Sequence, residues 1–311
     1  MALFYLGEAE VLILGLPIKG TRRGWLWAAY GLVCVVWASA WVFTENRVAV
    51  SLWQQGLVFG LAGGICRSLS RRRVGGRRSE RWKIGLGGFA VLGVPLLVRH
   101  LGFVRASDVD ASAAWALVPV VVVLAAGWSV SEDLQTRLWP CVLGLMGILL
   151  VLPVQYPPTS SESGGWVVLC LALISVGVGS VWLFGLLRDV ALVEAAWVLL
   201  SAQACVLLLA GWLEGERRQE LLQIPSPLVW LYLLQFVVLI WLLREMEPGR
   251  LAGRFLLVPL VTVVEGMVVL RPEITVRLVV GVGLLVVGVV GLLRPVETTK
   301  SSGLNLRRDY P

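Results

Sequence analysis

Charged residues and histidine are scarce in this sequence. Asp, Glu, Lys and Arg make up 15% of the 311 residues, against about 25% in a typical soluble domain. There is one histidine, no Cys-x-x-Cys pair and no Gly-x-x-x-x-Gly-Lys-[Ser/Thr] run. A zinc or haem site therefore has almost no ligands to draw on, and ATP has no phosphate-binding loop. We expect no metal and no cofactor.

Hydrophobic residues dominate instead. They make up 58% of the chain, and the mean hydropathy is +0.82. Apolar runs of about 17–25 residues are long enough to cross a hydrocarbon core of ~30 Å as helices. We therefore expect an all-α membrane protein with ten transmembrane helices. The ten runs lie at about 25–43, 48–66, 84–104, 111–128, 138–155, 165–186, 190–212, 226–243, 251–270 and 275–293.

The placement of Lys and Arg predicts the topology. With the N-terminus in the cytoplasm and ten spans, 20 of the 27 Lys and Arg residues fall in cytoplasmic segments. This excess follows the positive-inside rule, and its largest block is the short early loop 66–83. We expect a multi-pass protein of the cell (inner, cytoplasmic) membrane with both termini in the cytoplasm.

The same basic block bears on partners. Much of the net charge of +7 comes from the run between Arg71 and Arg78. No folded module is left over to present these charges to nucleic acid, so we expect no nucleic-acid partner. The loop 66–83 is expected to lie on anionic lipid headgroups. Formation of a homodimer is left open. All five cysteines lie in or at the edges of apolar runs, so we expect no disulfide.

Two motifs recur at half the chain length. A Ser-x-Trp-x-Phe motif at 39–43 reappears at 180–184, and Leu-Val-Pro at 117–119 reappears at 257–259. The polar, breaker-rich segment 156–164 divides the chain, with five apolar runs on each side. An odd number of spans per copy makes the second copy start on the opposite side. The sequence therefore predicts two inverted five-helix repeats, a recurring plan of secondary transporters.

This interpretation divides the chain into five parts. They are an interfacial or disordered leader at 1–24, a first repeat at 25–155, an inter-repeat loop at 156–164, a second repeat at 165–293 and a cytoplasmic tail at 294–311.

Several short motifs follow one another in the order and spacing of a known family. They are Trp37-Ala38-Ser39, Leu117-x-Pro119, Glu132-x-Leu134, Gly144-x-x-Gly147, Leu257-x-Pro259, Glu273-Ile274-Thr275 and Gly281-x-Gly283. Together they resemble the EamA-type branch of the drug/metabolite transporter superfamily over roughly residues 25–293. Ala38, Ser131 and Pro272 stand where that family usually has glycine, so the chain resembles a divergent member.

The resemblance implies secondary transport of a small metabolite or amphipathic compound, most often export, by alternating access. We expect no enzymatic activity, because no Ser/His/Asp set or metal cluster is found. Two alternatives stay open. One is an intramembrane enzyme acting on lipid-linked substrates, which would need a large extracytoplasmic loop that this chain lacks. The other is a membrane scaffold or receptor without transport activity.

Two acids lie inside predicted spans, where a charge costs at least ~2.5 kcal/mol at the bilayer centre and usually faces a cavity or partner. Glu265 lies well inside the ninth span, and Glu194 lies near the start of the seventh, close to Arg188. Both are candidates for proton coupling. The alternatives are a structural hydrogen bond for Glu265 and an interfacial ion pair for Glu194.

Aromatic and uncharged polar side chains at membrane depth are candidates for lining a substrate cavity. The expected cavity residues are Trp37, Trp41, Trp182, Glu265, Thr262, Gln235, Tyr232 and Gln55. Packing, interfacial belts and interhelical hydrogen bonds are the alternatives for the same residues. Pro119 and Pro259 each free a backbone carbonyl and are candidate hinges, or alternatively inert kinks.

Overall fold

The computed structural model describes residues 21–43, 51–71, 81–100, 113–129, 134–152, 163–215, 226–270 and 275–294. Most of the predicted leader and tail lie outside these residues, as do most of the inter-repeat loop and the basic stretch 72–80. All structural statements below concern the described part of the chain.

Helices account for nearly all of the described residues. In the first half they are α2 (Thr21–Phe43), α3 (Leu52–Arg71), α4 (Arg81–Gly88), the π-helical η3 (Phe89–Gly93), α5 (Val94–His100), α7 (Val118–Ser129) and α8 (Leu134–Val151). In the second half they are α9 (Ser163–Leu187), α10 (Leu192–Leu213), α11 (Pro227–Glu245), α12 (Pro248–Ala252), α13 (Arg254–Leu270) and α14 (Val276–Leu293).

Ten long helical rods result, because α4, η3 and α5 form one continuous helix. Within the described residues, seven helical stretches are long and apolar enough to span a membrane, and 24–39 and 113–127 are shorter apolar helices. The fourth rod is helical from Ala113, the first residue described there, and its predicted start at 111 lies outside the described residues. Its α-helix α7 begins at Val118, after a turn at Ala116 and Leu117. Pro119 is thus the second residue of that helix, where a missing N–H costs no hydrogen bond.

The third rod contains a π-helical turn that a neighbouring helix stabilises. The backbone N–H of Val94 donates to Phe89 O, five residues back. The next donor in this register would be Pro95, which has no N–H to give to Ala90. The hydroxyl of Ser175, on α9, donates to Ala90 O at 3.2 Å instead. A neighbouring helix therefore supplies the hydrogen bond that the proline cannot give to the Ala90 carbonyl.

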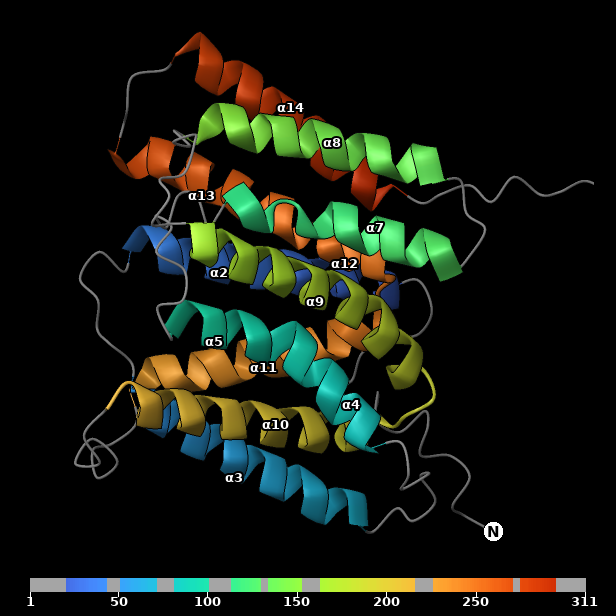
Figure 1. Cartoon of the computed structure of the whole chain (residues 1–311), viewed down its shortest axis with the longest axis vertical. Coiled ribbons are helices and arrows are strands. Elements are labelled where there is room, and N and C mark those ends of the chain that lie inside the picture. Colours follow the sequence, from blue (N-terminus) through green and yellow to red (C-terminus); the bar gives the residue numbers. More distant parts are fainter. Residues whose placement is uncertain are drawn as a thin grey trace, which may run out of the picture.

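The rods lie side by side in one bundle (Figure 1). The helices α8 and α14 pack together at one end of the long axis, and α3 packs on α10 at the other. Between them, α2 packs on α13 and α7 packs on α9. A Cβ at Gly147 of α8 would lie 2.7 Å from the carbonyl oxygen of Gly281 in α14. The two helices therefore approach each other closely at their glycines, as small residues permit in lipid.

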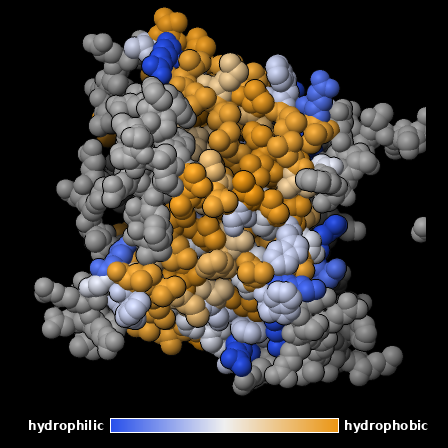
Figure 2. Space-filling view, in the orientation of Figure 1, coloured by the Kyte–Doolittle hydropathy of each residue, from blue (hydrophilic) through white to orange (hydrophobic). Residues whose placement is uncertain are grey.

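The surface of the bundle is apolar in the middle and polar at both ends of the helices. Figure 2 shows a broad hydrophobic band across the helices, with hydrophilic residues gathered toward their ends. Large hydrophobic side chains such as Leu61, Ile65 and Val268 are more than 60% exposed. A soluble protein rarely exposes so much contiguous apolar surface. The chain is a multi-pass membrane protein, as its sequence predicts.

Candidate functional site

The interface between α2 and α13 brings together ionisable side chains from distant parts of the chain. At one end, the hydroxyl of Tyr30 donates to the Arg250 carbonyl oxygen at 3.4 Å. At the other end, the hydroxyl of Ser39 donates to Glu265 Oε1 at 2.8 Å. The partners of Tyr30 and Ser39 follow in the same order along α12 and α13, so α2 and α13 run in the same direction. This interface, including the first turn of α13, is the candidate site.

Arg254 is the buried cation of this site. It is the first residue of α13, follows the break at Gly253 and is 5% exposed. Its guanidinium carbon lies 4.9 Å from the Phe255 ring centroid and 5.8 Å from that of Trp37. Its Nε and Nη1 atoms are buried and have no hydrogen-bond partner among the described residues. Aromatic faces therefore supply its described stabilising contacts.

Other arginines near the helix ends have polar partners. Arg137 of α8 forms an ion pair with Glu247 at 2.6 Å, and Arg250 lies 3.5 Å from the same carboxylate. Arg81 forms an ion pair with Glu194 at 2.9 Å. Arg254 differs from these three arginines, because it forms no ion pair with any acid among the described residues.

Glu265 is the acid of the site. It is half-buried on α13, and its Oε1 accepts the Ser39 bond. Its Oε2 is buried without a hydrogen-bond partner among the described residues. Eleven residues separate it from Arg254, which at a rise of 1.5 Å per residue is roughly 16 Å along the helix. The two groups are too far apart to form an ion pair.

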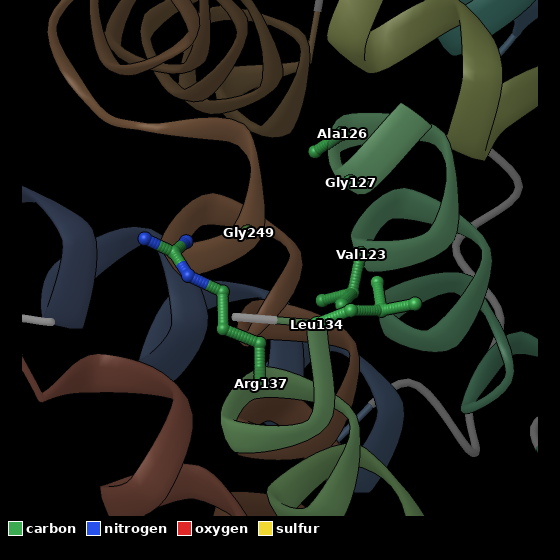
Figure 3. Close-up of a pocket in the computed structure, with 6 residues that line it drawn as sticks. All are labelled: Val123, Ala126, Gly127, Leu134, Arg137 and Gly249. Atoms are coloured by element: carbon green, nitrogen blue, oxygen red, sulfur yellow. The ribbon is translucent and has the colours of Figure 1, made fainter. Parts of the chain in front are cut away.

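A small cavity lies beside the Arg137 ion pair. Figure 3 shows Arg137 extending from α8 alongside the α12 ribbon at Gly249, with Val123 and Leu134 on the other side of the opening. Its volume is about 10 Å³, which is at the lower limit for a single water. This cavity is too small to hold a metabolite, so it is not the candidate site.

The structure places the predicted aromatic residues in different surroundings. Trp37 is half-buried at the α2–α13 interface beside Arg254. Trp41 lies on the last turns of α2, and its side chain is outside the described residues. Trp182 of α9 is 39% exposed, and its ring lies against Gly87 of α4. Of these three, Trp37 is the one that the structure brings to the candidate site.

The predicted polar residues are also spread over several helices. Thr262 is half-buried on α13, and its hydroxyl donates to Val258 O of its own helix at 3.0 Å. Tyr232 and Gln235 are half-buried on α11, and Gln55 is half-buried on α3. Pro259 lies inside α13, in contrast to Pro119 at the start of α7.

Glu194 forms an ion pair, which is one of the alternatives that the sequence left open. It lies in the first turn of α10, where a carboxylate interacts favourably with the helix dipole. Its ion pair joins it to Arg81 of α4 rather than to the sequence neighbour Arg188, whose guanidinium instead lies 5.6 Å from the Phe184 ring. Arg81 and Arg67 both contact the ring of Trp197, at 5.6 and 5.5 Å. Glu194 is therefore part of an interhelical ion pair.

Arg254 is the site residue that the sequence interpretation missed. The count of positive charges in the sequence assigned Arg254 to a cytoplasmic loop. In the structure it lies within the candidate span Pro248–Val269. One signal was present in the sequence: Arg254 directly precedes the run 255–264, which has no charged residue. A lone arginine at the edge of such a run has to be either exposed at the interface or buried with a function.

Comparisons with known proteins identify the fold but no family. No protein-family model and no curated protein match the chain. Thirteen chains of solved structures match it. One of them, a crystal structure of a protein, superposes with a TM-score of 0.65 at 18% sequence identity, over 85% of this chain and 96% of that chain. At this identity the likeness shows a shared multi-pass helical fold.

Proposed function

We propose that the protein is a secondary transporter, and most simply an exporter, of a small metabolite or amphipathic compound. It would work by alternating access across the cytoplasmic membrane, as a divergent EamA-type member of the drug/metabolite transporter superfamily. We propose no enzymatic activity for it. The pattern of helix pairs carries the proposal.

The pattern is the one expected of two equivalent halves related by a twofold axis. If the five rods of the first half correspond in order to those of the second, α3 corresponds to α10 and α8 to α14. Each of these helices packs on its own counterpart. By the same order α2 corresponds to α9, and α7 corresponds to α13. The pair α2–α13 therefore corresponds to the pair α9–α7, and the helices of each pair are in contact. These pairs support the proposal of two related halves.

This arrangement supports transport in particular. Inverted halves in a membrane can exchange inward-open and outward-open shapes around one central site. The α2–α13 pair joins one helix from each half, so it is a boundary at which such a movement would occur. Arg254 and Glu265 both lie on this boundary, and each has a buried polar atom without a described partner. Ionisable groups at membrane depth are expensive and commonly mark substrate or ion pathways.

A binding screen followed by flux measurements tests the proposal. The purified full chain would be screened for thermal stabilisation by amino acids, nucleosides, amphipathic cations and small organic anions. Radiolabelled forms of the stabilising compounds would then be offered to proteoliposomes containing the protein. We expect uptake above that of protein-free liposomes for at least one stabilising compound. Stabilisation with no protein-dependent flux of any such compound would contradict transport and favour a receptor or scaffold.

A further inference from the structure

The buried guanidinium of Arg254 lacks a counter-charge among the described residues. Removing a cation from water costs several kcal/mol in a protein unless pairing repays it. Glu247, seven residues earlier in the sequence, forms ion pairs with Arg137 and Arg250, and Glu265 lies roughly 16 Å away along α13. Tyr30 and Cys34 are close enough to interact electrostatically with the guanidinium, but both are ordinarily neutral at neutral pH.

The helix end adds to this positive potential. Arg254 is the first residue of a 17-residue helix with no acid in its first turn. The N-terminus of a helix carries a partial positive charge, so a cation there is unfavourable and an anion favourable. Helix geometry and side chain therefore both favour a negative group at this position.

The walls around the guanidinium are aromatic. Trp37 and Phe255 lie within 6 Å of the guanidinium carbon, and the Trp115 ring stacks on Phe255 with centroids 6.3 Å apart. Such walls exclude water and offer flat apolar surfaces. A ligand that pairs with Arg254 would therefore gain from an aromatic or planar apolar group as well as from its charge.

We infer that Arg254 is the binding site for the oxyanion of a small organic substrate, a carboxylate or phosphate attached to an aromatic or planar apolar group. This inference rests on the proposed function and names its substrate class. In the structure the guanidinium is almost fully covered, so access requires α2 and α13 to separate. The movement that opens the site is then the same movement that alternating access needs.

The test uses three probes of one shape and different charge: phenylacetate, phenylacetamide and phenethylamine. Binding to the purified full chain in neutral detergent would be followed by thermal stabilisation. We expect phenylacetate to stabilise the protein, and the neutral and cationic probes to have little effect. Arg254→Gln should weaken phenylacetate binding by about tenfold or more, the loss of a charge-assisted hydrogen-bonded contact. Arg244→Gln removes a charge near the end of α11 and should leave binding unchanged.

A second variant separates binding from a structural role. Arg254→Met keeps the length of the side chain and removes the buried charge. Arg254→Met should raise the melting temperature of the ligand-free protein and abolish its stabilisation by phenylacetate. If Arg254 had a structural role instead, its replacement would lower the melting temperature. Phenylacetate affinity that is equal in the wild type, Arg254→Gln and Arg254→Met would overturn the inference. Phenyl phosphate, which carries a phosphate in place of the carboxylate, serves as a second anionic probe. The inference would also be overturned if neither phenylacetate nor phenyl phosphate stabilised the protein.

Flux distinguishes this inference from the proposed function. Protein-dependent flux of neutral or cationic compounds, with no dependence of anion binding on Arg254, would refute the anion site and leave transport standing. Arg254-dependent anion binding without flux of any bound compound would confirm the site and contradict transport. A further experiment adds the anionic lipid phosphatidylglycerol to the detergent. If this lipid competes with phenylacetate and abolishes its binding, the natural ligand of Arg254 is a lipid headgroup and the substrate assignment is wrong.

Discussion

The hydrogen bond between Ser39 and Glu265 gives the sharpest quantitative prediction. The change is Ser39→Ala, which removes the described donor to Glu265 Oε1 and leaves both carboxylate oxygens without a described partner. A hydrogen bond to a charged group contributes about 1.5–3 kcal/mol. Because Glu265 is only half-buried, we take the lower end and expect a loss of about 1.5 kcal/mol in the free energy of unfolding.

Unfolding in mixed detergent micelles measures this loss, and a double-mutant cycle assigns it. In a Glu265→Gln background the bond to Ser39 is neutral, so Ser39→Ala should cost only about 0.5–1 kcal/mol there. Ser68→Ala is the matched control, because the Ser68 hydroxyl donates to Gly64 O within its own exposed helix turn. A Ser39→Ala cost that is near zero, or equal in both backgrounds, would refute the contact between the two helices.

Three other predictions address coupling, packing and the cavity. If Glu265 couples protons, Glu265→Gln should abolish accumulation driven by a pH gradient in vesicles and spare exchange at equal concentrations; retained accumulation would mean that coupling lies elsewhere. Gly147→Ala should cost about 1–3 kcal/mol of stability, because the new Cβ would lie 2.7 Å from backbone atoms of α14. Gly283→Ala meets open space and should be neutral or stabilising by up to ~1 kcal/mol, and equal costs would contradict the described packing. Trp37→Ala should reduce flux without lowering expression, because Trp37 lies beside Arg254, and unchanged kinetics in this variant would leave Trp37 a packing role.

The spans were predictable because the membrane itself imposes the pattern. A helix that crosses lipid must be apolar for about 20 residues, so hydropathy located all ten rods to within a few residues at most ends. The close contact at Gly147 was predictable for a related reason, since small residues let helices approach in lipid. Pro119 shows the limit of such reasoning: its position in the sequence suggested a kink, but the preceding turn makes it the second residue of a helix.

The site was less predictable, because it depends on which distant helices meet. Glu194 was expected near its sequence neighbour Arg188, yet α10 packs beside α4 and gives it Arg81. Ser39 and Glu265 are 226 residues apart, and only the α2–α13 contact joins them. Arg254 was counted as a loop charge because linear position suggests exposure. Its burial follows from the packing of α13 on α2, which brings the Tyr30 hydroxyl to 3.2 Å from the position of a Cβ at the neighbouring Gly253.

Counterflow tests the central claim of alternating access most directly. Proteoliposomes would be loaded with a high concentration of an unlabelled transported compound and diluted into a trace amount of its labelled form. A carrier that alternates between two faces predicts a transient accumulation of label inside, above its outside concentration, without any ion gradient or nucleotide. Label that only equilibrates, at the rate of protein-free liposomes, would contradict a carrier mechanism for this protein.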